Sequence, residues 1–211
     1  MVARDIEPSS LAEALIARAG AGRLIVALAG APGSGKSTLA EDLVERINRA
    51  DPGAAAILPM DGYHYDDGLL DELGRRARKG APDTFDVGGF AHMLRRLRAN
   101  EEDAVAVPVF DRAIEVARAG ARMIARDIRI VVAEGNYLLL DEAPWSQLRP
   151  LFDVTVSIDA TLDVLRDRLE ARWRGFNLPP EVIATKVEGN DLVNARRVIE
   201  GSVEADFRIR T

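Results

Sequence analysis

Continuous runs of apolar residues alternate along the chain with segments in which apolar residues recur every three or four positions. Residues 24–29 form an unbroken apolar run, which is typical of a strand buried on both faces of a parallel sheet. The next segment places Leu39, Leu43 and Ile47 on one face of an amphipathic helix. This alternation predicts an α/β fold in which helices cover both sides of a mostly parallel sheet.

The same pattern continues to the end of the chain. Further strands are predicted over residues 54–58, 104–110, 128–133, 152–158 and 205–209, and helices around 90–97 and over 162–174 and 182–199. Ser10 and Glu13 match a capping box that predicts the start of an N-terminal helix. Residues 66–86 form a polar excursion with one short helix. Because no Pro- or Ser-rich linker interrupts the pattern, we expect a single domain over residues 1–211.

Composition narrows the class of protein. The chain has 211 residues, 47% of them hydrophobic and 29% charged, which suits a globular domain with a substantial core. The absence of cysteine excludes disulfides and thiolate sites, and two histidines leave little material for a histidine metal cluster. A net charge of −6 argues against a nucleic-acid partner. No signal-peptide core and no apolar stretch of about 18 residues occurs, so we expect a cytoplasmic protein without a membrane partner.

Lysine is rare in this chain. Only three of the 28 basic residues are lysines: Lys36, Lys79 and Lys186. Genomic base composition accounts for the excess of arginine and carries no functional information, but a lysine retained against that bias can mark a position where the compact ammonium is needed. Lys36 is the best candidate for such a position.

Residues 30–37 fit the phosphate-binding pattern G-x-x-x-x-G-K-[ST], between a predicted buried strand and an amphipathic helix. Glycines let backbone N–H groups approach phosphate oxygens, and the helix N-terminus adds positive potential. Lys36 can reach the β- and γ-phosphates and the Ser37 hydroxyl can ligate Mg²⁺. The predicted nucleotide contacts are Gly30, Ala31, Pro32, Gly33, Ser34, Gly35, Lys36, Ser37 and Thr38. The sequence therefore predicts a protein that binds a nucleoside triphosphate.

Missing motifs exclude several classes of P-loop protein. The chain has no Asn-Lys-x-Asp segment, which a GTPase uses for guanine, and no Leu-Ser-Gly-Gly-Gln segment of a transporter ATPase. Residues 86–89 match D-x-x-G, but they follow no apolar strand and predict the start of a helix instead. The chain is also too short for a motor or a helicase.

Two carboxylates follow predicted strands near the P-loop. Glu134 ends the strand over 128–133, where a carboxylate can orient a metal ion or a metal-bound water. Asp61 follows the run 54–58 at the same sheet edge, where it can accept the proton of an acceptor hydroxyl. The plainer alternatives are a surface glutamate at a strand end and an ordinary Asp-Gly turn.

Two arginines point to a lid. Arg168 and Arg172 lie four positions apart on one flank of the helix over 162–174. With the glycine and prolines that follow, they predict a lid at about residues 170–182. Arg168 is predicted to act in catalysis and Arg172 to contact the nucleotide. The alternative is a solvated charged face. Asn190 and Asn194 share a helix face and are predicted either to meet the substrate or to cap local backbone.

Several motifs together resemble a known family. They occur in the order Gly30 to Ser37, Met60-Asp-Gly-Tyr-His64, Lys79-Gly-x-Pro82-x-x-Phe85-Asp86, Pro108-Val-Phe-Asp111 and Glu134-Gly135. This set resembles the phosphoribulokinase, uridine kinase and bacterial pantothenate kinase family, in particular its short bacterial fructose transport system kinases, or fructokinases. Residues 188–196 resemble the same subgroup, and the similarity runs from about residue 20 to the end of the chain.

The resemblance implies a three-layer α/β/α P-loop nucleoside triphosphate hydrolase fold and ATP- and Mg²⁺-dependent phosphorylation of a small, sugar-like alcohol. It makes Asp61 the general base and Glu134 the acidic residue near the metal. The acceptor pocket would then be formed by Tyr63, His64, Tyr65, Phe110 and Arg112. Pantothenate kinases carry Tyr-Ser-His where this chain has Phe110-Asp-Arg112, which disfavours pantothenate. A nucleoside or pantothenate-type kinase and a P-loop regulatory ATPase remain alternatives, and the oligomeric state is open, a homodimer included.

Overall fold

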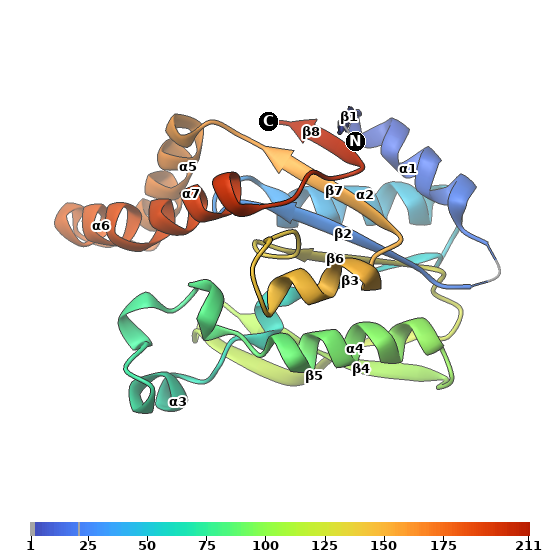
Figure 1. Ribbon diagram of the computed structural model, residues 1–211, viewed down its shortest axis with the longest axis horizontal. Helices are drawn as coiled ribbons and strands as arrows, with labels where there is room; N and C mark the ends of the chain where they lie inside the picture. Colours follow the sequence, from blue (N-terminus) through green and yellow to red (C-terminus); the bar gives the residue numbers. More distant parts are fainter. Residues whose placement is uncertain (1–2, 21) are drawn as a thin grey trace.

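A six-stranded parallel sheet forms the centre of the computed structural model, which describes residues 3–20 and 22–211 (Figure 1). Its strand order is β1-β8-β7-β2-β6-β3, and each neighbouring pair is parallel. The strands are β1 (Arg4–Asp5), β2 (Leu24–Gly30), β3 (Ala55–Pro59), β6 (Ile130–Gly135), β7 (Val154–Asp159) and β8 (Phe207–Arg210). This arrangement confirms the predicted α/β fold of the P-loop kinase type.

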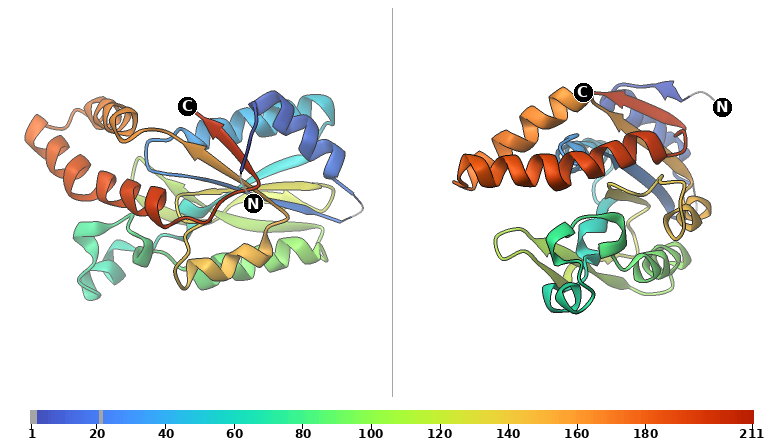
Figure 2. Two further views of the ribbon diagram at one scale, coloured as in Figure 1. Left: turned by 45° about the horizontal axis from the view of Figure 1, so that its top comes forward. Right: turned by 60° about the vertical axis from the view of Figure 1, so that its left-hand side comes forward.

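Helices cover both faces of the sheet (Figure 2). Helices α1 (Pro8–Arg18) and α2 (Lys36–Ala50) pack on one face, and α4 (Val87–Ala99) and α7 (Leu192–Gly201) pack on the other. Helices α5 (Leu162–Gly175) and α6 (Pro180–Lys186) extend past the carboxyl ends of the strands, on the left in Figure 1. The carboxyl edge of the sheet, where ligands bind in open α/β folds, is thus flanked by α5 and α6.

The central strand β2 explains the unbroken apolar run in the sequence. Ile25, Ala27 and Ala29 belong to the core cluster that includes the buried residues of α4 and α7. Val26 and Leu28 belong to the opposite cluster, with the buried residues of α1 and α2. Because successive side chains of a strand point to opposite faces, a strand covered on both sides has no polar position.

A separate antiparallel hairpin was only half predicted. Strand β4 (Ala104–Asp111) matches the predicted strand over 104–110, but it pairs with β5 (Val116–Ala125), which the sequence pattern did not reveal. Strand β5 is mostly exposed, including Met123 at 58%, and therefore lacks a continuous apolar signal. Arg122 ties the hairpin to the sheet by donating to the carbonyl of Ile57 in β3, at 3.0 Å.

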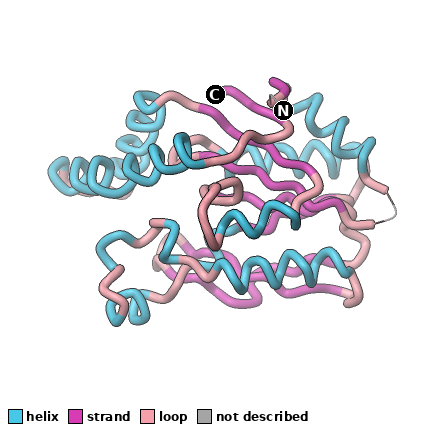
Figure 3. Tube along the Cα trace, in the orientation of Figure 1, coloured by secondary structure: helices cyan, strands magenta, loops and turns pink. Residues whose placement is uncertain are grey.

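The shorter helical elements complete the fold (Figure 3). They are α3 (Asp67–Glu72), the 3₁₀ turns Met60–Tyr63, Arg76–Arg78, Pro82–Thr84 and Trp145–Leu151, and the π-helical turn Val187–Asp191. Elements α6, the π-helical turn and α7 confirm the helix predicted over 182–199. Within the described residues, 3–20 and 22–211, no helix has the length and apolarity needed to span a membrane.

Two predicted helix starts have different outcomes. The capping box at Ser10 was wrong, because α1 begins at Pro8 with Glu7 as its N-cap and Ser10 lies inside the helix. Proline favours the first helical position, where its fixed φ suits the helix and its missing N–H is not needed. Asp86 confirms the other start, since its carboxylate accepts a hydrogen bond from the Gly89 amide at 2.8 Å as the N-cap of α4.

Candidate active site

The P-loop lies between β2 and α2 and has the backbone conformation that its glycines allow. Gly33 and Gly35 have φ values of 83° and 84°, in the left-handed region where a side chain is strained. Helix α2 begins directly after them at Lys36, so its unpaired N-terminal amides open onto the loop. The Oγ atom of Ser34 is buried beneath the loop without a hydrogen-bond partner.

Glu134 lies directly beside the P-loop because β2 and β6 are neighbours in the sheet. The Ser37 hydroxyl donates to Glu134 Oε2 at 3.2 Å, and Glu134 is 5% exposed. Burial raises the pKa of Glu134, although the Lys36 ammonium opposes this shift. Burial also lowers the pKa of Lys36, and the carboxylates of Glu134 and Asp61 oppose that shift. The three side chains therefore form one electrostatic group at the start of α2.

Asp61 belongs to the 3₁₀ turn that follows β3, whose last residue, Pro59, is in register with Glu134. Its Oδ2 atom lies 2.6 Å from an Nη of Arg112, and its side chain is 15% exposed. Burial alone raises the pKa of Asp61, but protonated His64, Arg112 and Lys36, in that order, outweigh burial and bring the pKa below its usual range. Asp61 is therefore a carboxylate at neutral pH.

The glycine after Asp61 permits a close backbone approach. A Cβ atom on Gly62 would lie 2.5 Å from the carbonyl oxygen of Pro108 in β4. The turn that carries Asp61 can therefore pack against β4, which leads directly to Arg112. An Asp-Gly turn alone does not explain this arrangement, because the glycine is required by packing and its conformation has no positive φ.

Aromatic rings form one wall beside Asp61. The ring of His64 lies 4.0 Å from that of Phe85 and 4.7 Å from that of Phe110, between centroids. His64 Nδ1 is 2.8 Å from the carbonyl oxygen of Asp61, and because a carbonyl only accepts, Nδ1 carries the hydrogen. Burial lowers the pKa of His64, although Asp61 opposes this, so the imidazole is neutral at pH 7.

A cavity of about 350 Å³ brings many of the predicted site residues together. Those that line it are Pro32, Lys36, Asp61, His64, Phe110, Arg112, Arg172 and Asn194. They come from the P-loop, the turn after β3, the end of β4, and helices α5 and α7. The cavity thus joins the predicted nucleotide and acceptor residues at the carboxyl edge of the sheet.

Other predicted site residues lie outside the lining of this cavity. Tyr63 is 8% exposed and packs edge-to-face on Phe90 of α4, with ring centroids 5.0 Å apart. The Tyr65 amide donates to the carbonyl of Thr84 in the neighbouring loop, at 3.0 Å. Arg168 lies against the P-loop instead, where it donates to the Ser34 carbonyl at 3.4 Å and the Thr211 hydroxyl at 3.1 Å.

Some lining residues were not identified from the sequence. They include Arg76, Lys79, Asn136, Trp173, Lys186 and Asp191. The rarity of lysine was an available signal, since all three lysines of the chain line the cavity. Asn136 follows Glu134-Gly135, and its Oδ1 atom is buried without a partner. Trp173 and Asp191 meet only in the folded chain, where the indole N–H donates to the carboxylate at 2.7 Å.

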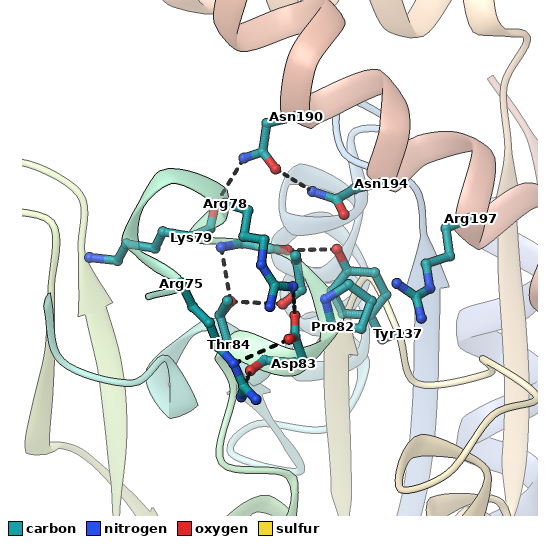
Figure 4. A network of polar contacts seen from close by, with 12 residues as sticks. Arg75, Arg78, Lys79, Pro82, Asp83, Thr84, Tyr137, Asn190, Asn194 and Arg197 are labelled. Atoms are coloured by element: carbon teal, nitrogen blue, oxygen red, sulfur yellow. Dashed lines mark hydrogen bonds and ion pairs between the residues drawn. The ribbon is translucent and has the colours of Figure 1, made fainter. Parts of the chain in front are cut away.

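The loop that carries Lys79 is fixed through its backbone carbonyls (Figure 4). Tyr137 donates from its hydroxyl to the Gly80 carbonyl at 2.6 Å, and Asn190 donates from Nδ2 to the Lys79 carbonyl at 3.0 Å. Asn194 in turn donates to Asn190 Oδ1 at 3.0 Å. Asn190 and Asn194 therefore connect the π-helical turn and α7 to the loop, and Asn194 also reaches the cavity.

A second cavity, of about 650 Å³, opens on the other side of the P-loop. It reaches from Gly30 and Ala31 to the carboxyl ends of β7 and β8 and to the last turn of α7. Ile158, Val198 and Val203 give part of its lining an apolar character. The P-loop is thus shared by two cavities.

The parallel sheet, the P-loop and the two carboxylates at strand ends define a P-loop kinase. Residues 25–172 match the Phosphoribulokinase / Uridine kinase family. The chain belongs to this family and is an ATP-dependent kinase of the P-loop class.

Individual relatives cover most of the chain. A "putative fructose transport system kinase" from Silicibacter sp. TM1040 has a crystal structure with 37% identity and a TM-score of 0.89, covering 96% of this chain and 98% of that one. YggC of Escherichia coli, an uncharacterized protein, is 36% identical over 187 residues, or 88% of this chain and 76% of YggC. A "putative uridine kinase", C227.14 of Schizosaccharomyces pombe, is 34% identical over 195 residues, or 88% of this chain and 82% of the relative.

Proposed function

We propose that the protein transfers the γ-phosphoryl group of ATP to a hydroxyl of a small, sugar-like acceptor bound in the cavity at Asp61. The observation that carries this proposal is the ionised Asp61 carboxylate, which lines the same cavity as the P-loop lysine. A base close to the phosphate site is what transfer to an alcohol requires. The likeness to the "putative fructose transport system kinase" at 37% identity agrees with a polyol acceptor.

The P-loop, residues 30–38, binds the phosphates, with the Lys36 ammonium on the β- and γ-phosphates. Arg172 lines the cavity with its guanidinium carbon 5.1 Å from the centroid of the Trp173 ring, and it has no ion pair within residues 3–20 and 22–211, so its N–H groups are available for the transferred phosphoryl group. Arg168, which contacts the Ser34 carbonyl, acts on the P-loop side. The nucleoside extends into the second cavity, whose apolar lining beside Gly30 and Ala31 suits a purine.

Magnesium fits the oxygen donors beside the P-loop. The Ser37 hydroxyl and the Glu134 carboxylate lie 3.2 Å apart, and no group of three His, Cys, Asp or Glu residues that could hold a metal occurs among the described residues. Mg²⁺ commonly uses one or two protein oxygens together with waters and substrate phosphates. We assign Ser37 and Glu134 to this role, in which bound Mg²⁺ neutralises charge on the phosphates.

The residues around Asp61 then act on the acceptor. The acceptor hydroxyl donates its hydrogen to the Asp61 carboxylate, and its oxygen attacks the γ-phosphorus as the bond to the β–γ bridging oxygen breaks. The proton passes to Asp61, and Lys36 and Arg172 stabilise the charge on the phosphoryl oxygens. His64, Phe110 and Arg112 surround the acceptor, whereas the core position of Tyr63 assigns it to packing.

A nucleoside acceptor is the second candidate. The ring centroid of His64 lies 4.0 Å from that of Phe85 and 4.7 Å from that of Phe110. The three rings form an aromatic wall on which a nucleobase can stack. The likeness to the S. pombe protein agrees with this candidate.

The test is ADP release from ATP and Mg²⁺ in the presence of sugars, polyols, nucleosides and pantothenate, each offered separately. We expect release to depend on at least one alcohol and to stop in Asp61→Asn. Asp71→Asn, a change at an exposed position of α3, is the matched control and keeps the rate. ADP release that is the same with every alcohol and with none would identify a regulatory ATPase and contradict the kinase proposal.

A further inference from the structure

All three lysines of the chain line the cavity at Asp61, although lysines are only three of its 28 basic residues. Lys36 belongs to the P-loop, but Lys79 and Lys186 come from other walls. Their ammonium groups lie against aromatic rings, Lys79 at 5.2 Å from the centroid of Phe110 and Lys186 at 4.6 Å from that of Trp173. The P-loop accounts for only one of the three compact charges in this cavity.

Lys79 and Arg76 are two cations that the segment after α3 contributes to the lining of the cavity. The Lys79 ammonium donates to Asp67 Oδ1 and to the Glu115 carbonyl, each at 2.6 Å, and its side chain is 11% exposed. An Nη of Arg76 lies 2.7 Å from Asp67 Oδ2. Two cations therefore share the single carboxylate of Asp67.

The cationic side chains of the cavity outnumber its carboxylates. Its lining carries six cationic side chains and three carboxylates. Lys36 and Arg172 are assigned to the phosphates of ATP, and Arg112 pairs with Asp61. Arg76 and Lys79 belong to the segment after α3, and Lys79 shares the ring of Phe110 with Arg112, whose guanidinium carbon is 6.0 Å from the centroid. Arg76 and Lys79 are thus cations on the Phe110 side of the cavity that the assignments to ATP and Asp61 do not use.

The backbone holds Lys79 ready for a ligand. Tyr137 and Asn190 bind the carbonyls of Gly80 and Lys79, and Gly80 itself donates from its amide to the Thr84 hydroxyl at 3.0 Å. In Figure 4 the Lys79 side chain points away from the neighbouring cluster of Arg75, Arg78 and Asp83. A positively charged group held in place before binding loses little entropy when an anion arrives.

We propose that the acceptor carries an anionic group, a phosphate or a carboxylate, in addition to the hydroxyl that is phosphorylated, and that Lys79 and Arg76 bind this group. The proposal rests on the function proposed above and narrows it to charged polyols. The anion displaces Asp67 as the partner of both cations while the hydroxyl lies at Asp61. Charge-assisted hydrogen bonds to two cations supply the discrimination against neutral polyols.

Matched acceptor pairs test the substrate class. D-Ribose against D-ribose 5-phosphate and D-fructose against D-fructose 6-phosphate test a phosphate, and glycerol against D-glycerate tests a carboxylate. We expect the anionic member of at least one pair to have a kcat/KM about 10- to 100-fold higher. Neutral members that match or exceed their anionic partners in every active pair would overturn this inference and leave the kinase proposal intact. If no acceptor promotes ADP release, the kinase proposal fails and the anion site is decided by binding alone.

Binding of simple anions tests the two cations without turnover. The protein is first saturated with a nonhydrolysable ATP analogue and Mg²⁺, and then titrated with inorganic phosphate or acetate in a calorimeter. We expect Lys79→Met and Arg76→Gln each to raise the dissociation constant of the preferred anion about 10- to 100-fold, and Asp67→Asn to lower it. No anion binding to the loaded wild-type protein, or equal binding by all variants, would overturn the proposal.

Arg78→Gln is the matched control. Arg78 lies in the same 3₁₀ turn as Arg76 and both side chains are 48% exposed, but Arg78 pairs with Asp83 and does not line the cavity. We expect anion binding by this variant to equal that of the wild type, and a matching loss in Arg78→Gln would contradict a specific site. Thermal unfolding verifies each variant, and Arg76→Gln, at a half-exposed position, decides the outcome if Lys79→Met does not fold.

Discussion

At the scale of single residues, the site depends on charges that adjust one another. Lys36, Asp61 and Glu134 are close enough for each to shift the pKa of another, and burial acts on all three. Asp61 has its pKa lowered by cations, whereas burial raises the pKa of Glu134. Position separates their roles: Asp61 lines the cavity with His64 and Phe110, which favours it as the base, whereas Glu134 lies beside Ser37, where a metal-bound oxygen would lie.

Lys36→Ala tests the phosphate site. The lysine is half-buried and contributes charge more than packing, so we expect the fold to persist while ATP turnover falls by about 10²-fold or more. Steady-state kinetics and thermal unfolding measure the two properties separately. Near-normal turnover by a folded Lys36→Ala protein would refute the P-loop assignment.

Arg112→Gln tests the electrostatic control of Asp61 through the pH dependence of kcat. The positive groups hold the pKa of Asp61 below its usual value of about 3.9, whereas burial raises the pKa of Glu134, so Glu134 protonates first when the pH of the wild-type protein falls. The Arg112 guanidinium lowers the pKa of both carboxyls, so its removal raises both values and loss of kcat on acidification begins at a higher pH. Arg118→Gln, on the exposed β5 strand, is the control and leaves the profile unchanged. An Arg112→Gln profile identical to that of the wild type would disprove the electrostatic effect of Arg112 on Asp61 and Glu134.

At the scale of elements, the strands and helices that could be predicted from the sequence are those with a clear pattern of apolar residues. Strands β2 and β6 and the helical run from α6 to α7 have such patterns, and the P-loop has a fixed spacing. Strand β5 has no such pattern, because its residues are mostly exposed. Lys79 belongs to a motif of the family and Asn136 to none, but neither motif nor periodicity shows that they line the cavity, because that depends on how distant loops approach. The lysine count held information about Lys79 that periodicity lacks.

Arg23 joins several elements in a way the sequence did not indicate. Arg23 is 6% exposed. Its guanidinium donates hydrogen bonds to the carbonyls of Leu97 at 2.9 Å, Ala125 at 2.8 Å and Ile128 at 2.8 Å. It thus fastens the end of α4 and the end of β5 near the start of β2.

Arg23→Met measures this junction. The methionine retains an apolar stem but leaves the buried carbonyls without donors, so we expect the free energy of unfolding to fall by about 3 kcal/mol. Chemical denaturation gives this value, and KM for ATP stays unchanged because Arg23 is remote from both cavities. An unfolding free energy equal to that of the wild type would show that the carbonyls find other partners.

At the scale of the whole molecule, helices α5 and α6 extend past the carboxyl edge of the sheet (Figures 1 and 2), and Arg172, Trp173 and Lys186 from these helices line the cavity at Asp61. We propose that residues 170–182, which join these helices, act as the lid. Trp173 lines the cavity from this segment and binds Asp191 in the π-helical turn, whereas Trp145 is buried in the core at 1% exposure.

The two tryptophans allow this lid to be followed by fluorescence. Addition of ATP and acceptor changes the surroundings of Trp173, so we expect the emission of the wild-type protein to shift. Trp173→Phe, which retains only Trp145, shows no shift. A ligand-induced shift of the same size in Trp173→Phe would place the change elsewhere and contradict the lid.

The central claim is that Asp61 is the base for transfer to an alcohol, and the most direct measurement is kcat of Asp61→Asn with ATP affinity determined in parallel. Asparagine retains the size of aspartate and suits a turn equally well, but it cannot accept the proton. We predict that kcat falls by roughly 10²–10⁴-fold while the dissociation constant of ATP, measured by calorimetry, remains nearly the same. An unchanged kcat in Asp61→Asn would contradict the account and leave Glu134 as the remaining candidate base.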